Sequence, residues 1–126
     1  DVRVKVIERT NIRQLAYEVI NEKMDIIVAD TSFISLKIVI PSAEKFMRDN
    51  TLVLALIKPQ FEAGKQNVGK GGVVKDPEIR KLVINELKFF FKERGYLINQ
   101  IIPSPILGPK GNKEYIISLN FKKNSN

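Results

Sequence analysis

Two apolar runs of the sequence each end in a polar side chain that could take part in chemistry. Thr51–Ile57 (TLVLALI) is followed by Lys58, and Asp25–Ala29 is followed by Asp30. Runs this apolar favour strands that are covered on both faces, as in an α/β sheet. In open α/β sheets the ligands lie beyond the carboxyl ends of the strands. We therefore expect Lys58 and Asp30 to belong to one site, where a lysine and a carboxylate can handle a proton.

The composition excludes several kinds of site. The chain of 126 residues contains neither cysteine nor histidine. It can therefore form no disulfide, no Ser-His-Asp triad and no zinc site with His or Cys ligands. A metal ion would need oxygen ligands, and no acidic cluster has the spacing for one, so we expect no metal. Any general base must be Lys, Asp, Glu or Tyr.

The length and the charge favour one domain, over residues 1–126, with a polyanionic partner. The chain has 21 Lys and Arg against 14 Asp and Glu, a formal net charge of +7. Such an excess suits a nucleic acid or serves only solubility. No apolar run approaches the roughly 20 residues of a membrane span, and no signal-peptide pattern is present. These features fit a cytoplasmic protein that does not insert into a membrane.

The spacing of apolar residues predicts alternating strands and helices. Strands are expected at Val2–Glu8, Asp25–Ala29, Thr51–Ile57, Tyr96–Ile102 and Tyr115–Phe121. Helices are expected at Asn11–Lys23, Ser35–Asp49 and Asp76–Arg94. The early alternation implies a parallel sheet, whereas the last two strands have no helix between them and can pair antiparallel. That ending is typical of Rossmann-like methyltransferases.

Four short motifs occur in order along the chain. They are Asp30–Leu36 (DTSFISL), Ile57–Glu62 (IKPQFE), Val68–Val73 (VGKGGV) and Ser104–Glu114 (SPILGPKGNKE). Together they resemble the haemolysin-A (TlyA) family of FtsJ-like RNA 2′-O-methyltransferases, and the resemblance covers nearly the whole chain. It implies a Rossmann-like α/β fold that uses S-adenosylmethionine and acts on RNA, with ribosomal RNA or ribosomal subunits as the expected partner.

The resemblance implies that Asp30, Lys58 and Glu114 are catalytic. A ribose hydroxyl becomes a nucleophile when its proton leaves, and a lysine oriented by carboxylates can accept or steer that proton. Each residue also has a local alternative. Lys58 could reach solvent, Asp30 could cap the turn after its strand, and Glu114 could pair with a neighbouring lysine.

The family's cofactor site is only partly represented in the sequence. The resemblance implies that Glu8, Thr10, Asn11 and Asp30 lie on the cofactor, although Thr10 or Asn11 could equally cap a helix. The further catalytic lysine of the family, its glycine-rich cofactor loop and its ribose-binding acid would lie upstream of these residues. We therefore expect the chain to be the C-terminal portion of a methyltransferase domain, inactive on its own and poor at binding the cofactor.

Two glycine-containing loops carry the lysines expected to contact RNA phosphates. These residues are Lys65, Lys70, Lys75, Lys110 and Lys113. Backbone amides of glycines and lysine charges suit phosphate, although a mobile, solvated loop is the alternative. Phe33 and Phe61 are the candidates for base stacking.

The resemblance also predicts a structural conflict. It places two strands, absent here, between the first strand and Asp25–Ala29, so one flank of Asp25–Ala29 would be exposed. We expect a homodimer or strand exchange through the truncated sheet, a displaced first segment, or marginal stability. Two other functions remain open: a non-catalytic RNA-binding module of the same fold, and a haemolysin, which the lack of membrane-length segments disfavours.

Overall fold

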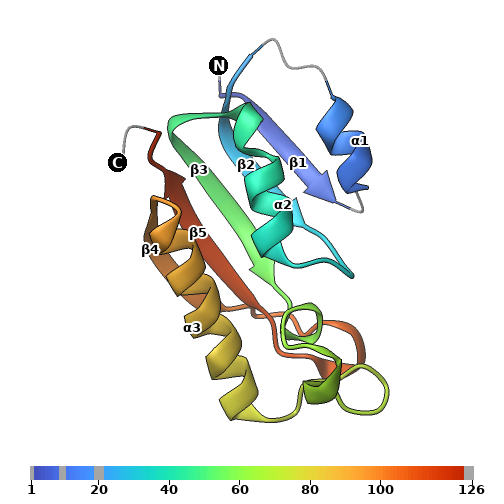
Figure 1. The fold of residues 1–126 in the computed structure, drawn as a ribbon. Helices are drawn as coiled ribbons and strands as arrows, with labels where there is room; N and C mark the ends of the chain where they lie inside the picture. Colours follow the sequence, from blue (N-terminus) through green and yellow to red (C-terminus); the bar gives the residue numbers. More distant parts are fainter. Residues whose placement is uncertain (1, 9–10, 19–21, 124–126) are drawn as a thin grey trace.

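The computed structural model of the chain describes residues 2–8, 11–18 and 22–123. These residues form a five-stranded sheet with helices packed against it (Figure 1). The strands are β1 (Val4–Glu8), β2 (Met24–Asp30), β3 (Met47–Ile57), β4 (Tyr96–Pro103) and β5 (Tyr115–Phe121). The α-helices are α1 (Ile12–Tyr17), α2 (Leu36–Ser42) and α3 (Pro77–Glu93). Short 3-10 turns occupy Glu44–Phe46, Pro59–Phe61, Lys65–Asn67 and Pro109–Gly111.

The sheet has a parallel half and an antiparallel half. Its strand order is β1-β2-β3-β5-β4. β1, β2 and β3 are parallel, and helices connect them because parallel neighbours need a crossover. β5 lies antiparallel between β3 and β4. The predicted alternation and the predicted antiparallel ending are both confirmed.

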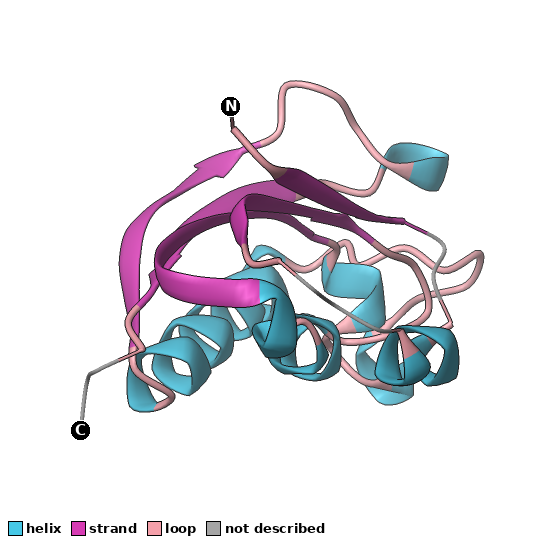
Figure 2. Ribbon diagram, turned by 90° about the horizontal axis from the view of Figure 1, so that it is seen from above, coloured by secondary structure: helices cyan, strands magenta, loops and turns pink. Residues whose placement is uncertain are grey.

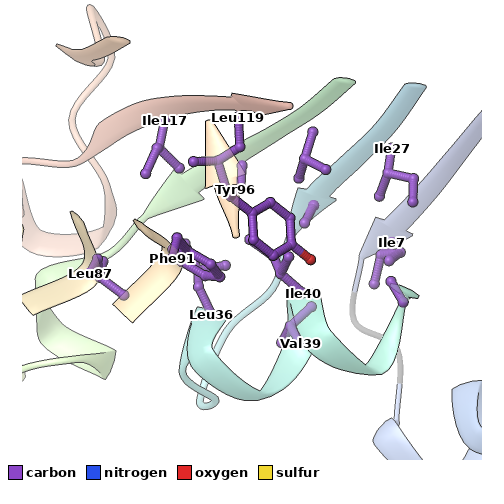
Figure 3. Packing of buried hydrophobic residues seen from close by; sticks show 14 of the residues in the cluster. Ile7, Ile27, Leu36, Val39, Ile40, Leu87, Phe91, Tyr96, Ile117 and Leu119 are labelled. Atoms are coloured by element: carbon purple, nitrogen blue, oxygen red, sulfur yellow. The ribbon is translucent and has the colours of Figure 1, made fainter. Parts of the chain in front are cut away.

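The three α-helices lie on the same face of the sheet, as the view in Figure 2 shows. The strand residues that point toward them, such as Ile27, Val53 and Ile117, are fully buried. They pack on apolar helix residues that include Leu36 and Phe91 (Figure 3). Alternate residues of β3 on the opposite face are only half-buried, so one face of the sheet forms the core and the other is partly open.

The longest helix has the boundaries that its sequence signals predict. The Asp76 side chain accepts a hydrogen bond from Glu78 N at 2.9 Å, and Pro77 occupies the first helical position. Gly95, with a φ of 93°, follows the helix and lets the chain turn into β4. Val83, Leu87 and Phe91 form its buried stripe.

Two of the predicted helices were too long. α1 ends at Tyr17, and residues 19–21 lie outside the described part of the chain. α2 ends at Ser42, one residue beyond Pro41, which cannot donate a helical hydrogen bond. The rest of the second predicted helix is a 3-10 turn and the start of β3, because Met47 is buried and pairs with Met24 of β2.

β1 lies directly beside β2, with Val4 opposite Ile26 and Glu8 opposite Asp30. Ile7 of β1 is buried in the core next to Ile27. We expected a homodimer or strand exchange, a displaced first segment, or marginal stability. This pairing matches the second outcome, because β1 lies away from the position that the family resemblance implies. The expectation of an exposed flank on β2 was wrong, because backbone hydrogen bonds to β1 cover that flank.

Candidate active site

Lys58 and Asp30 form an ion pair at the carboxyl ends of two parallel strands. Asp30 is the last residue of β2, and Lys58 directly follows β3. Lys58 Nζ lies 2.6 Å from Asp30 Oδ1 and donates a hydrogen bond to Ser32 Oγ at 3.2 Å. The Lys58 side chain is only 13% exposed, whereas that of Asp30 is 48% exposed. The lysine is therefore held in place by protein groups, while solvent reaches the carboxylate.

A second carboxylate fixes the two loops that surround this pair. Glu62 accepts hydrogen bonds from Ser35 Oγ at 2.6 Å and from Leu36 N at 2.8 Å. Ser35 is also the N-cap of α2, since its Oγ accepts a hydrogen bond from Lys37 N. Burial raises the pKa of Glu62 above its ordinary value of 4.5, although both hydrogen bonds act in the opposite direction. Glu62 thus connects the loop after β3 to the start of α2.

Glu114 lies at the same end of the sheet as Lys58. Ile57 of β3 pairs with Tyr115 of β5, so the register continued by one residue sets Lys58 opposite Glu114. Glu114 is 7% exposed. Its Oε2 accepts a hydrogen bond from Gln60 Nε2 at 2.9 Å, and no hydrogen bond or ion pair joins it to Lys58 among the described residues. The structure therefore brings the three predicted catalytic residues to one sheet end, with Glu114 held by Gln60.

Gly108 lies against the Glu114 carboxyl group. A Cβ atom at position 108 would be 2.1 Å from Glu114 Oε2 and 2.5 Å from its Cδ. Gly108 has a φ of −78°, a value that any residue can adopt. A side chain at position 108 would therefore force the Glu114 carboxyl group to move from this position, so glycine matters here for space and not for backbone conformation.

The residues expected on the cofactor have different local environments. Glu8 ends β1 and is paired in register with Asp30, so it lies at the same sheet end as the ion pair. Asn11 caps α1, because its Oδ1 accepts a hydrogen bond from Arg13 N at 2.8 Å. This is the capping alternative, and a cofactor role for Asn11 stays a prediction. Thr10 lies outside the described residues.

The lysines expected to contact RNA are all exposed, and they are carried by two loops that one buried side chain joins. Asn112 Oδ1 accepts a hydrogen bond from Val74 N at 3.0 Å. Asn112 Nδ2 donates to Gly72 O at 2.8 Å and to Pro109 O at 3.1 Å. Asn112 thereby connects the segment of Lys70 and Lys75 to that of Lys110 and Lys113. Lys65 lies in its own 3-10 turn.

Phe33 is an exposed aromatic residue beside the ion pair. It directly follows Ser32, which accepts the hydrogen bond from Lys58. Its side chain is 89% exposed, and its φ of 67° is in the left-handed region that bulky residues avoid. Its ring centroid lies 4.8 Å from that of Phe61.

Sequence reasoning missed the residues that hold the predicted site. Ser32 lies two residues after Asp30, and Gln60 lies two residues after Lys58, both within the quoted motifs. This short spacing was the only sequence feature that could have indicated their contacts in the site. Asn112 has partners distant in sequence, and Gly108 has a steric contact with Glu114, neither of which a single sequence reveals. The described residues contain no group of three or more acidic side chains placed to hold a metal ion.

A family model for FtsJ-like methyltransferases matches residues 1–121. The chain therefore belongs to the FtsJ-like methyltransferase family. That assignment agrees with the resemblance carried by the four motifs, and with the mixed sheet that ends in an antiparallel strand pair.

Curated relatives of this chain are named for two different activities. The 16S/23S rRNA (cytidine-2'-O)-methyltransferase TlyA of Mycobacterium tuberculosis is 43% identical over 119 residues, which are 94% of this chain and 44% of that protein. Hemolysin A of Brachyspira hyodysenteriae is 37% identical over 118 residues, 92% of this chain and 49% of that protein. The chain thus spans less than half the length of these relatives.

Solved structures support the same fold. A crystal structure described as a "putative hemolysin" from Lactococcus lactis has a TM-score of 0.80 at 34% identity, over 95% of this chain and 58% of that one. A crystal structure described as a "putative S-adenosylmethionine dependent methyltransferase" from Listeria monocytogenes has a TM-score of 0.56 at 12% identity, over 86% of this chain and 67% of that one, which shows the fold alone. Within the described residues, no helix has the length and apolar character needed to cross a membrane.

Proposed function

We propose that this chain contributes the Asp30–Lys58–Glu114 end of the sheet to a methyltransferase that modifies a ribose 2′-hydroxyl in ribosomal RNA. The observation that carries the proposal is the ion pair of the largely buried Lys58 side chain with Asp30, with 2.6 Å between the two charged atoms. The substrate class is supported by the name of the Mycobacterium tuberculosis relative, an rRNA (cytidine-2'-O)-methyltransferase that is 43% identical.

Lys58 is the group placed to manage the proton of the ribose hydroxyl. As the oxygen forms its new bond to the methyl carbon, the bond between that carbon and the donor sulfur breaks, and the proton of the oxygen must leave. A neutral Lys58 Nζ can accept that proton, and a charged one can donate a hydrogen bond that orients the oxygen. Asp30 and Ser32 fix the position of Nζ on one side. Glu114, opposite Lys58 in the register, supplies a second carboxylate at the same sheet end. Holding the hydroxyl in line for transfer contributes much of the rate.

The residues present fit one side of an S-adenosylmethionine site. That cofactor supplies the methyl group when it is bound. Asp30 and Glu8 place carboxylates at the ends of adjacent strands, where hydroxyl and ammonium donors of a ligand can be bound. The buried Thr31 Oγ1, one residue from Asp30, has no partner among the described residues and is available to a ligand. The first glycine of the given sequence is Gly64, so these residues represent only the side of the site that the strand ends form.

The RNA would lie across the two joined basic loops and Phe33. The five exposed lysines can bind phosphates, which position a nucleic acid without reading its sequence. The exposed ring of Phe33, directly beside Ser32, can stack on a base next to the reactive ribose. A protein with this role acts where ribosomes are, in the cytoplasm.

On its own, this chain is expected to be inactive and to form a homodimer. Its residues provide one side of a cofactor site, and in the described part of the chain the parallel strands carry helices on one face only. Parallel sheets are generally covered on both faces. Val4 and Val6 are exposed on the open face, so a second copy could cover it. Analytical ultracentrifugation at rising protein concentration should show a dimer. A monomer at every concentration would contradict the proposed homodimer but not the proposed methyltransferase function.

The test of the main proposal uses a protein of the length of the curated relatives that carries this chain. Ribosomal subunits and methyl-labelled S-adenosylmethionine are incubated with this protein, with Lys58→Met, and with Lys92→Met as a matched control at an exposed position on α3. Label in RNA that is lost only in Lys58→Met supports the proposal. Equal labelling by all three proteins would overturn the role of Lys58.

A non-catalytic RNA-binding module of the same fold is the second candidate, favoured by the net charge of +7 and the two joined basic loops. That function predicts binding that weakens as salt rises, because lysines release counterions from phosphates. It also predicts no dependence on Lys58. Salt-dependent binding without methyl transfer to ribosomal subunits or free ribosomal RNA would favour this candidate.

A further inference from the structure

We propose that Gln60 is a positioning residue that fixes the Glu114 carboxylate relative to Lys58, and that Gly108 provides the space for this arrangement. The inference rests on the proposed methyltransferase function. Gln60 and Glu114 are separated by 54 residues in the sequence, yet Gln60 Nε2 donates to Glu114 Oε2 at 2.9 Å. Gln60 is uncharged and does not titrate, and Gly108 has no side chain, so the role of each residue comes from its contact with Glu114.

Gln60 is rigidly connected to the backbone of Lys58. Phe61 N donates to Lys58 O at 2.8 Å, and Glu62 N donates to Pro59 O at 3.0 Å, which closes a tight 3-10 turn directly after β3. Pro59 is buried and its ring fixes the backbone angle within this turn. The position of the Gln60 amide is therefore set by the same strand end that carries Lys58.

The orientation of the Gln60 amide is determined by Glu114. An ionised carboxylate can only accept hydrogen bonds, so the amide nitrogen must face Glu114. The amide oxygen, Oε1, is then buried without a partner among the described residues. Buried polar atoms are normally paired. Gln60 thus leaves its own acceptor unsatisfied while it donates to Glu114, which is unexpected for a side chain that only fills space.

The Glu114 carboxyl group is confined on the other side by Gly108. Any side chain at position 108 would overlap Glu114 Oε2, because even a Cβ atom would lie 2.1 Å from it. The loop that carries Gly108 is closed by a hydrogen bond from Gly108 N to Asn112 O at 2.8 Å. Ser104 N also donates to the Glu114 backbone oxygen at 2.8 Å. The Glu114 carboxylate therefore lies between the Gln60 amide, which donates to it, and the backbone of Gly108, which packs against it.

The first test compares Gln60→Leu with Gln100→Leu, a matched change at an exposed position of β4, in the protein of full relative length. Leucine approximates the volume of glutamine but cannot donate to Glu114. We expect Gln60→Leu to lower kcat for methyl transfer about 10- to 100-fold, because small misplacements at a reacting centre cost that much. KM for RNA should stay within about twofold, because the hydrogen bond does not touch the RNA. Gln100→Leu should behave as the unmodified protein.

A second variant separates positioning from folding. In Gln60→Glu with Glu114→Gln, the hydrogen bond re-forms with donor and acceptor exchanged, but the carboxylate is now at position 60. We expect the melting temperature of this double variant to exceed that of Gln60→Glu alone, where two carboxylates face each other. Its kcat should remain low.

Each outcome supports or overturns the inference. Unchanged kcat in Gln60→Leu, while Lys58→Met is inactive, would overturn the role of Gln60 and leave the proposed function intact. Recovery of kcat in the double variant Gln60→Glu with Glu114→Gln would also overturn the inference. It would show that methyl transfer does not need the carboxylate at position 114. Methyl transfer by Lys58→Met at the unmodified rate would instead overturn the role of Lys58, and no methyl transfer by the unmodified protein would show that the proposed function itself had failed.

Discussion

The rings of Phe33 and Phe61 pack with their centroids 4.8 Å apart at an interplanar angle of 50°, although the Phe33 backbone is in the left-handed region with a φ of 67°. That conformation costs a bulky residue about 1–2 kcal/mol. The contact between the two rings stabilises the fold by about 0.5–1.5 kcal/mol, which offsets part or all of this conformational cost. The protein thus holds an exposed aromatic ring beside Ser32 and Lys58 with little or no gain in stability, as functional sites often do.

Phe33→Asn is the first prediction. Asparagine tolerates the left-handed conformation, so the relief of strain should balance the lost ring contact, and the free energy of unfolding should change by less than about 1 kcal/mol. RNA affinity should fall by about 1–3 kcal/mol, because one stacked base loses its platform. Urea unfolding and RNA-binding titrations measure the two quantities. Phe89→Asn, at an exposed position on α3, is the control and should leave RNA affinity unchanged.

Loss of at least 3 kcal/mol of stability in Phe33→Asn, on the scale of a large-to-small core substitution, would show that this ring serves folding. Unchanged RNA affinity would remove Phe33 from the RNA surface.

Asn112→Ala is the second prediction and addresses the link between the two basic loops. It leaves Val74 N without its hydrogen bond and removes the donor to Gly72 O and Pro109 O. We expect a loss of roughly 2–3 kcal/mol in the free energy of unfolding, because at least one buried backbone group becomes unsatisfied.

Hydrogen exchange at the Val74 amide should accelerate in the same variant, since that amide is buried and depends on Asn112. Asn99→Ala is the matched control. Asn99 is exposed, and among the described residues its side chain donates to the Ser118 and Asn120 side chains, so its loss should cost less than about 1 kcal/mol. Equal effects of the two substitutions would show that Asn112 does not join the loops.

The third prediction concerns the pH dependence conferred by Glu62. Burial raises its pKa in the folded state above the ordinary value of 4.5, so the folded state binds this proton more tightly than the unfolded chain does. The contribution of Glu62 to stability should be largest below pH 4.5, should fall as the pH rises toward the folded-state pKa, and should be constant above it.

Urea unfolding of the protein and of Glu62→Gln, from about pH 4 to about pH 8, measures this contribution as a difference. The advantage of the unmodified protein over Glu62→Gln should shrink as the pH rises. Glu93→Gln, at an exposed position of α3, corrects for general charge effects. An advantage that grows with pH would mean that the hydrogen bonds from Ser35 and Leu36 outweigh burial.

The fourth prediction tests the pairing of β1 with β2. Val6 and Val28 are register partners, and adjacent strands lie about 4.8 Å apart, within reach of a disulfide. The chain has no other cysteine. Val6→Cys with Val28→Cys should therefore cross-link under mild oxidation within one chain. Val4→Cys with Val28→Cys, offset by two residues, should not, because its Cα atoms lie roughly 8 Å apart.

No cross-link in either pair would indicate that other strands separate β1 from β2 in solution, as the family resemblance implies. Non-reducing gel electrophoresis of the 126-residue chain distinguishes an internal cross-link from one between two copies.

The strand ends that carry the site could be predicted from the sequence, because Lys58 and Asp30 interrupt apolar runs that only a buried strand explains. The start of β3 could not. Met47 pairs with Met24, and then Leu52 pairs with Ile26, so the register shifts within this stretch. Thr51 Oγ1 stabilises the irregularity by donating to Met24 O and accepting from Arg48 N. Such tertiary hydrogen bonds override the helical pattern of the local sequence.

The roles of Asp30, Lys58 and Glu114 depended on the four motifs, since each residue alone also fits an ordinary surface position. Gln60 and Gly108 were missed for a different reason. Gln60 contacts Glu114 from the turn after β3, and Gly108 contacts it from within the loop that joins β4 to β5. Neither residue type predicts such a contact. The close packing of Gly108 on Glu114 and the hydrogen bond from Gln60 to Glu114 depend on the folded structure, so the sequence alone does not predict them.

The insertion of β5 between β3 and β4 has a consequence for the order in which the protein can be made. The last described strand along the chain is a central strand of the sheet, paired with both neighbours. A ribosome releases β3, with Lys58, well before it releases Glu114. Until then the hydrogen-bonding edge of β3 is open, and such pairings between distant segments form slowly. The nascent chain therefore passes through a stage in which one half of its site exists without the other.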